Sequence, residues 1–114
     1  MTDANMTTQS ETPKDKVLEI GEWTINYSRR DVAVDGKFVD LTDKEFEIVA
    51  FLAERRGEAV NRADLFQAVW GYEMDFNSNS LEVYIYRIRN KVGKPGQRRT
   101  QLRTVRSYGY RLDI

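Results

Sequence analysis

The sequence has no cysteine and no histidine, and only two of its 114 residues are proline. Without cysteine, the chain forms neither disulfides nor a thiolate zinc site. Without histidine, it lacks the commonest general base and the commonest transition-metal ligand. No apolar run is long enough to span a membrane, and the first residues show no signal-peptide pattern. We therefore expect a cytoplasmic domain without a metal or cofactor, in which the usual routes to enzymatic catalysis are closed.

Acidic and basic residues are equal in number but unevenly distributed. The chain carries 18 of each, so its net charge is zero, which by itself argues against nucleic-acid binding. Residues 1–76 contain nine basic and sixteen acidic residues, whereas residues 77–114 contain nine basic and two acidic ones. The C-terminal part is therefore suited to facing phosphates. A solvated basic face is the simpler alternative, but it does not account for the tyrosines and glycines of the same part.

The length and composition predict one globular domain. A chain of 114 residues with 40% hydrophobic and 11% aromatic content can bury one modest core. Residues 1–16 are polar and have no hydrophobic periodicity, which predicts a disordered tail or linker. The domain is therefore expected at residues 17–114.

The first part of this domain is predicted to be an antiparallel sheet. Residues 17–41 contain short runs of strand-forming residues, and Trp23, Ile25 and Tyr27 alternate with polar neighbours. Asp35-Gly36 lies between two such runs and predicts a tight hairpin, because both central residues of that turn need a positive φ. Nothing in this region resembles a ligand site, so we interpret it as a structural platform.

A first helix is predicted to begin at a capping box. In Thr42-Asp-Lys-Glu45, the threonine can accept from the amide of the glutamate, and the glutamate can reach back to the amide of the threonine. The apolar spacing continues to Ala53. Arg55-Arg56 is expected in the last turn, and Gly57 just beyond it is expected to end the helix.

Two more helices follow. Ala59-Val60 is too short for an assignment, but Asn61 is a suitable cap for a helix over residues 62–70, which Gly71 can end. Residues 80–92 show the clearest helical periodicity in the chain. One of the polar residues at its start, Ser78, Asn79 or Ser80, is expected to cap this third helix.

The third helix has two faces of different chemistry. One is an apolar stripe at helical spacing, made of Leu81, Ile85, Ile88 and Val92. The opposite face is mixed and consists of Val83, Tyr86, Arg87 and Asn90, flanked by Glu82 and Arg89. Arginine suits guanine or phosphate, glutamate a cytosine amino group, and valine a thymine methyl. This pattern suits a helix that is anchored by one side and reads DNA with the other, but an ordinary amphipathic helix with a solvated face fits it at least as well.

Two segments flank the third helix. Before it, residues 71–79 form an acidic loop with three large apolar residues, Tyr72, Met74 and Phe76, which suit either packing or a protein contact. After it comes a basic loop. In residues 102–114, two runs in which apolar and polar side chains alternate flank a short turn. This pattern predicts a second hairpin with Arg106 next to its tip.

The order of sheet, three helices and terminal hairpin is that of a winged helix-turn-helix, an α+β fold. Three runs are more specific than this order: RADLFQAVW at 62–70, LEVYIYRIRNK at 81–91 and TVRSYGYRL at 104–112. In these runs the chain resembles the C-terminal DNA-binding effector domain of OmpR/PhoB-type bacterial two-component response regulators. The resemblance covers about residues 18–114. It implies a transcription regulator that binds double-stranded DNA sequence-specifically, with helix 80–92 in the major groove and wing 102–114 at the minor groove.

The resemblance also implies site residues and partners. The expected DNA-binding residues are Ser80, Glu82, Val83, Tyr86, Arg87, Arg89, Asn90, Lys91, Thr104, Arg106 and Tyr108. Among these, Arg87 is the expected base or phosphate contact and Arg106 the expected minor-groove contact, whereas Arg89 suits either a backbone contact or an intramolecular ion pair. The expected partner-contact loop, which in the family can contact RNA polymerase, consists of Tyr72, Glu73, Met74, Asp75 and Phe76. Family members often bind direct repeats as tandem homodimers.

The chain departs from the family pattern at several positions. Asn79 and Tyr86 stand where basic residues are frequent, Tyr84 where histidine is frequent, and Ser107 where a wing glycine is usual. Residues 1–16 are too few to form the receiver domain of the family. We therefore expect either an isolated effector domain, with a receiver domain in the parent protein, or a protein that works without that switch. The alternative function is a winged-helix protein-interaction module without DNA binding.

Overall fold

The protein is described by a computed structural model that covers residues 17–75, 78–93 and 101–114. The expected tail at residues 1–16, Phe76 of the expected partner-contact loop, and most of the basic loop, residues 94–100, lie outside the described residues. The described residues form a four-stranded sheet, three helices and a three-stranded sheet. No helix in this part of the chain is long and apolar enough to cross a bilayer.

The N-terminal sheet is antiparallel and consists of consecutive strands. In order across the sheet they are β2 (Val17–Ile20), β3 (Trp23–Asn26), β4 (Asp31–Val34) and β5 (Lys37–Val39). Side chains alternate between the two faces, so one face is apolar and buried and consists of Ile20, Trp23, Ile25, Val32 and Val34. The predicted antiparallel sheet is confirmed.

The turn between β4 and β5 has the predicted geometry. Asp35 and Gly36 have φ values of 55° and 81°, so both lie in the left-handed region that this two-residue hairpin turn requires. The amide of Asp35 also donates to the carbonyl oxygen of Glu22 at 2.7 Å, which connects this turn to the turn between β2 and β3.

Helix α1 (Asp43–Ala53) begins at the predicted capping box. The amide of Glu45 donates to Thr42 Oγ1 at 3.3 Å, and the amide of Thr42 donates to Glu45 Oε1 at 2.9 Å. The predicted end is one turn too long, because Arg55 and Arg56 lie in turns after the helix rather than in its last turn. Gly57, with φ of 80°, follows these turns.

Helices α2 (Arg62–Trp70) and α3 (Ser80–Val92) have the predicted bounds. The Asn61 side chain caps α2 by accepting from the amides of Ala63 and Asp64, and Gly71 ends it in the left-handed conformation. Helix α3 starts after Asn79, which makes no side-chain cap bond to the described residues. Instead Ser78 Oγ accepts from the amide of Ser80 at 3.2 Å.

The C-terminal sheet contains one strand that was not predicted. The predicted hairpin is β7 (Leu102–Val105) and β8 (Gly109–Leu112), and the short strand β6 (Val60–Asn61) pairs with the other side of β8. Gly109 permits this pairing because glycine has no Cβ. A Cβ at this position would collide with the carbonyl oxygen of Val60. The start of α2 and the wing hairpin are therefore joined through one sheet.

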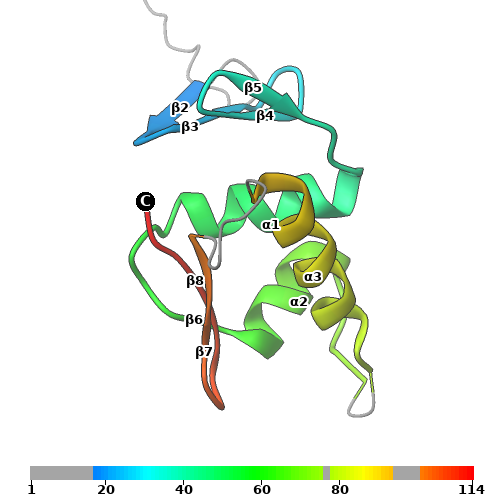
Figure 1. Ribbon diagram of the computed structural model, residues 1–114. Helices are drawn as coiled ribbons and strands as arrows, with labels where there is room; N and C mark the ends of the chain where they lie inside the picture. Colours follow the sequence, from blue (N-terminus) through cyan, green and yellow to red (C-terminus); the bar gives the residue numbers. More distant parts are fainter. Residues whose placement is uncertain (1–16, 76–77, 94–100) are drawn as a thin grey trace, which may run out of the picture.

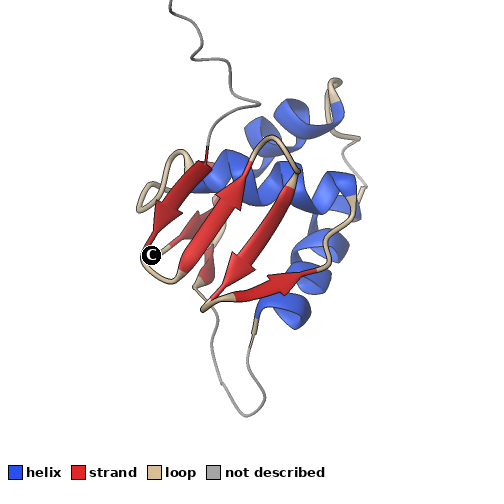
Figure 2. Ribbon diagram, turned by 90° about the horizontal axis from the view of Figure 1, so that it is seen from above, coloured by secondary structure: helices blue, strands red, loops and turns tan. Residues whose placement is uncertain are grey.

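The two sheets lie on different sides of the helices. Figure 1 shows the N-terminal sheet on one side of α1, with α2, α3 and the C-terminal hairpin extending on the other side. Figure 2, which looks down on the N-terminal sheet, shows the helices beneath it. The buried residues of both sheets and all three helices form one core. This is the predicted α+β winged-helix architecture.

Candidate nucleic-acid interface

Helix α3 presents the mixed face that the sequence predicted. The stripe of Leu81, Ile85, Ile88 and Val92 is buried in the core. On the other side, Val83, Tyr86, Arg87 and Asn90 are all exposed, and Tyr86 retains 67% of its accessible surface. A face with an exposed valine and an exposed tyrosine is suited to contact with another molecule rather than to water alone.

The first turn of α3 is anchored by Glu82. Its carboxylate accepts two hydrogen bonds from Arg62 of α2, with Nε donating at 2.7 Å and Nη2 at 2.8 Å, and a third from the hydroxyl of Tyr110 at 3.3 Å. The Arg62 guanidinium holds the pKa of Glu82 below its usual range despite partial burial of the carboxyl. Glu82, expected to contact DNA, thus joins α2, α3 and β8. The roles of Arg62 and Tyr110 here were missed at the level of sequence, because both residues are distant from Glu82 along the chain.

Arg89 connects α3 to the wing. Its Nε donates to the carbonyl oxygen of Leu102 at 3.0 Å, and its Nη2 donates to Thr104 Oγ1 at 2.7 Å. These partners are a carbonyl and a hydroxyl, and neither is the acidic residue of the ion pair that the sequence left open as one alternative. Burial lowers the pKa of Arg89 from its usual value. A DNA contact by Arg89 or Thr104 stays a prediction, and any such contact has to coexist with these bonds.

The last turn of α3 is anchored by Lys91. Its Nζ lies 2.6 Å from Oε1 of Glu45 on α1, and the Glu45 side chain is only 1% exposed. Burial acts to raise the pKa of Glu45, but the Lys91 ammonium and the Thr42 amide outweigh it and lower the pKa. Glu45 Oε2 has no hydrogen-bond partner among the described residues. From the sequence Glu45 was identified only as a capping residue; its helical spacing of four and seven residues from the buried Val49 and Leu52 is the signal of its burial.

The wing tip is formed by three exposed residues, Arg106, Ser107 and Tyr108. Ser107, which replaces the usual glycine, has φ of 64° and so adopts the left-handed conformation. The turn is closed by a hydrogen bond from the amide of Tyr108 to the carbonyl oxygen of Val105 at 2.9 Å. The backbone of Tyr108 is also bonded to α2, since its carbonyl oxygen accepts from the amide of Arg62 at 3.0 Å.

Two arginines of this surface differ from the other basic residues near it. Lys91 is paired with Glu45, and Arg103 and Arg111 both lie within 4 Å of Asp113, at 3.8 and 2.6 Å. Within residues 17–75, 78–93 and 101–114, Arg87 and Arg106 have no carboxylate at salt-bridge distance. One is on the exposed face of α3 and the other at the wing tip.

The loop before α3 is partly packed. Tyr72 is 61% exposed, yet its ring meets Phe66 edge-on at 5.6 Å, and Met74 packs against the core. Glu73 and Asp75 are exposed. Packing therefore accounts for Met74, whereas the expected partner contact of this loop stays a prediction.

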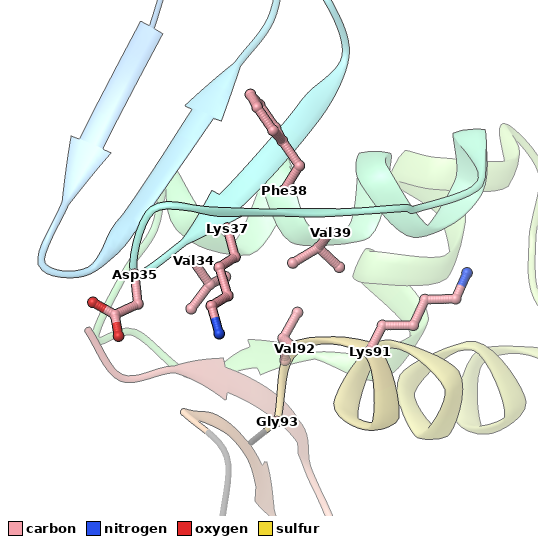
Figure 3. Close-up of a pocket in the computed structure, with 8 residues that line it drawn as sticks. All are labelled: Val34, Asp35, Lys37, Phe38, Val39, Lys91, Val92 and Gly93. Atoms are coloured by element: carbon pink, nitrogen blue, oxygen red, sulfur yellow. The ribbon is translucent and has the colours of Figure 1, made fainter. Parts of the chain in front are cut away.

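A cavity of about 380 Å³ lies between the β4–β5 hairpin and the end of α3. Figure 3 shows Val34, Val39 and Val92 facing this space, with the Phe38 ring pointing away from it. Its lining includes Val92 of the buried stripe of α3 but none of Val83, Tyr86, Arg87 and Asn90, so it is separate from the exposed face. In the described part of the chain, no group of three or more acidic side chains is placed to hold a metal ion.

Comparison with known proteins identifies a matching family and several relatives. The family model described as "Transcriptional regulatory protein, C terminal" matches residues 36–112. The response regulator ArlR of Staphylococcus aureus is 33% identical over 98 residues, which are 86% of this chain but only 44% of ArlR. The chain thus spans less than half the length of this relative.

Solved structures agree with this match. The DNA-binding domain of RstA from Klebsiella pneumoniae, determined in complex with the RstA box, superposes with a TM-score of 0.77 at 28% identity, covering 86% of this chain and 97% of RstA's. DrrB of Thermotoga maritima, an OmpR/PhoB homologue, gives a TM-score of 0.72 at 29% identity, covering 86% of this chain and 44% of DrrB. The chain therefore belongs to the family of C-terminal domains of transcriptional regulatory proteins and has the fold of an OmpR/PhoB-type effector domain.

Proposed function

We propose that this chain binds double-stranded DNA in a sequence-specific manner, as the effector domain of a bacterial response regulator. Helix α3 enters the major groove with Val83, Tyr86, Arg87 and Asn90, and the wing places Arg106 at the minor groove. The observation that carries the proposal is that Arg87 and Arg106 are exposed on these two elements without a carboxylate partner among the described residues. Such arginines suit guanine edges and the negative potential of a narrow minor groove.

The contacts of the other expected residues refine their roles. Glu82, Arg89 and Lys91 are bonded to α2, the wing and α1, respectively, so we assign them to holding α3 in place. Ser80 at the start of α3, and Thr104 and Tyr108 on the wing, are proposed phosphate contacts. Phosphate contacts fix the position of a protein on the duplex, whereas base contacts select the sequence.

The proposal is tested by measuring affinity for a duplex selected from a random pool, and for its single-base variants, at two salt concentrations. Arg87→Ala should weaken binding to the selected site by about 1–3 kcal/mol and relax the preference at one base pair. Arg106→Ala should weaken binding most where the minor groove is narrow and A·T-rich. Equal weakening on all sequences, with a salt slope reduced by about 1, would instead make Arg87 a phosphate contact.

Arg56→Ala is the matched control. Arg56 is exposed after α1 and lines a depression next to β2, so it lies on neither the exposed face of α3 nor the wing tip. Its substitution removes the same charge and should leave affinity nearly unchanged. If wild-type protein bound no duplex even at low salt, DNA binding by this chain would be refuted.

A second candidate function is a protein-interaction module, favoured by the exposed Tyr72 ring in the loop before α3. We propose that this loop contacts a protein such as RNA polymerase.

The assembly and the parent protein are also proposals. We propose that two copies of the chain bind direct repeats of DNA in tandem. Since ArlR is more than twice as long as the matched region, we also propose a receiver domain in the parent protein. In every one of these assignments the chain acts by binding, with no catalytic step and no cofactor, and works in the cytoplasm.

A further inference from the structure

A series of aromatic rings connects α2 to the exposed face of α3. Phe66 and Trp70 of α2 are stacked, with ring centroids 4.5 Å apart and planes 10° apart. The ring of Tyr84 meets Trp70 edge-on, at 5.3 Å and 88°. The guanidinium carbon of Arg87 lies over the Tyr84 ring, 5.3 Å from its centroid. A continuous set of ring contacts therefore leads from the buried Phe66 to the exposed Arg87.

We propose that Tyr84 is a positioning residue for Arg87, and that it contributes to the sequence specificity of DNA binding by holding the guanidinium ready to read a base. The inference rests on the proposed function, because it requires α3 to face the major groove. It adds a residue that acts on base recognition through Arg87 and was not among the expected DNA contacts.

The first support is the spacing of the two residues along α3. Residues three apart on a helix lie on the same side, so the Tyr84 ring is directly accessible to the Arg87 side chain. A guanidinium over the face of a tyrosine ring is attracted by the ring quadrupole. The expected partner of Arg87 in DNA is a base edge that requires a planar, two-pronged approach. Holding the guanidinium before binding reduces the entropy lost on binding.

The second support is that the Tyr84 ring is itself fixed. It lies against Trp70, which is stacked on Phe66, and Phe66 is only 3% exposed. On the α1 side, Lys44 donates to the carbonyl oxygen of Val69 at 3.0 Å, and its Nζ lies 6.0 Å from the Trp70 centroid. Tyr84 therefore offers Arg87 a support held by α2, whereas an isolated exposed tyrosine would move with its own rotamers.

The test varies the ring at position 84 without changing its shape. Tyr84→Phe should leave affinity within about twofold, because the ring face is kept. Phenylalanines with increasing fluorination at the same position should weaken binding to the selected duplex stepwise, by about two- to fivefold in total, as the quadrupole is lost. The loss should appear as reduced discrimination at the base pair that Arg87 reads, with discrimination at other base pairs unchanged.

A double-mutant comparison separates positioning from general stability. Tyr84→Leu should weaken binding in the wild-type background but have no further effect in the Arg87→Ala background. Phe51→Leu is the matched control, because Phe51 of α1 also carries a guanidinium over its ring. The guanidinium carbon of Arg55 lies 3.6 Å from the centroid of the Phe51 ring. It should leave both affinity and discrimination unchanged.

The outcomes distinguish the inference from the proposed function. Failure of the wild-type protein to bind any duplex overturns both. If the wild-type protein binds DNA but Tyr84→Leu has equal effects in the wild-type and Arg87→Ala backgrounds, the positioning role is overturned. The proposal of DNA binding is not affected by that result. Fluorination without effect on discrimination also overturns it, and this series remains decisive even where Tyr84→Leu fails to fold.

Discussion

The N-terminal and C-terminal sheets are hydrogen-bonded to different helices. Both pack against the core through buried apolar side chains, such as Trp23 and Ile25 in the first sheet and Leu102 in the second. The turn between β3 and β4 is bonded to α1, because Arg30 donates to Asp43 at 2.6 Å. The C-terminal sheet is bonded to α3, through Arg89 to Leu102 and Thr104 and through Tyr110 to Glu82. Apolar packing tolerates small shifts, whereas hydrogen bonds depend on angle and distance. The bonds of the C-terminal sheet therefore specify the angle between α3 and the wing.

The largest expected effect comes from Gly109→Ala at the joint between β6 and β8. The new Cβ would collide with the carbonyl oxygen of Val60 and lie 2.8 Å from the amide nitrogen of Arg62, so backbone must move. We expect a loss of about 3 kcal/mol in the free energy of unfolding. DNA affinity should fall as well, measured below the melting temperature.

Gly36→Ala provides the matching change in the N-terminal sheet. Gly36 has φ of 81°, but a Cβ at this position would meet no atom of the described residues within 4 Å, so only backbone strain is added. We expect about 1 kcal/mol of destabilisation and unchanged DNA affinity. Equal effects of the two glycine substitutions on affinity would remove the distinction between the sheets.

Lys91→Met is expected to have the next largest effect, because it leaves the buried Glu45 carboxylate without its cation. Since Lys91 itself is partly exposed, we expect about 2 kcal/mol of destabilisation at pH 7, less than for a fully buried pair. Glu45→Gln combined with Lys91→Met should recover part of this loss, since no unpaired charge remains. Urea denaturation of the two variants measures both effects.

The pH dependence gives an independent check on the same pair. The pKa of Glu45 is lowered in the folded protein, so its contribution to stability is complete above the ordinary value of 4.5 and is lost as the pH falls through the folded value. In Lys91→Met, burial without the ammonium should raise this pKa instead. The variant's deficit should therefore shrink on acidification from pH 7 to pH 4. A constant deficit would show that the two charges are not coupled.

A smaller effect than that of Lys91→Met is expected from Arg89→Lys. An ammonium cannot reproduce the fork that bonds both Leu102 and Thr104, so we expect about 1 kcal/mol of destabilisation. Amide hydrogen exchange should accelerate in β7 more than in the N-terminal sheet. Arg111→Lys, which disturbs a partly exposed pair with Asp113, should leave exchange in β7 nearly unchanged.

Features of the fold that depend on neighbouring residues were predictable from the sequence. The Asp35-Gly36 turn, the Thr42–Glu45 capping box and the bounds of α2 are each determined by residues within a few positions. The two faces of α3 also followed from spacing alone. The end of α1 was misplaced because basic residues followed by glycine suit a helix end and the turns after it equally well.

Features that depend on distant partners were not predictable. Strand β6 has two residues and no alternation of its own, and it exists because β8 lies beside it. Similarly, the sequence marked Glu82 and Lys91 as charges on a helix without indicating Arg62 or Glu45 as their partners. A periodic pattern tells which face a residue occupies, but the partner across an interface is set by the packing of whole elements.

The pairing of β6 with β8 also has a consequence for the order of folding. Val60 pairs with Tyr110, about fifty residues away along the chain, whereas each hairpin of the N-terminal sheet pairs residues close in sequence. Closing a long loop costs more chain entropy than closing a short one, so local contacts form faster. We expect the platform to form early and the wing joint to close late. A chain emerging from the ribosome would thus complete its proposed DNA-binding surface only after its last strand has been synthesised.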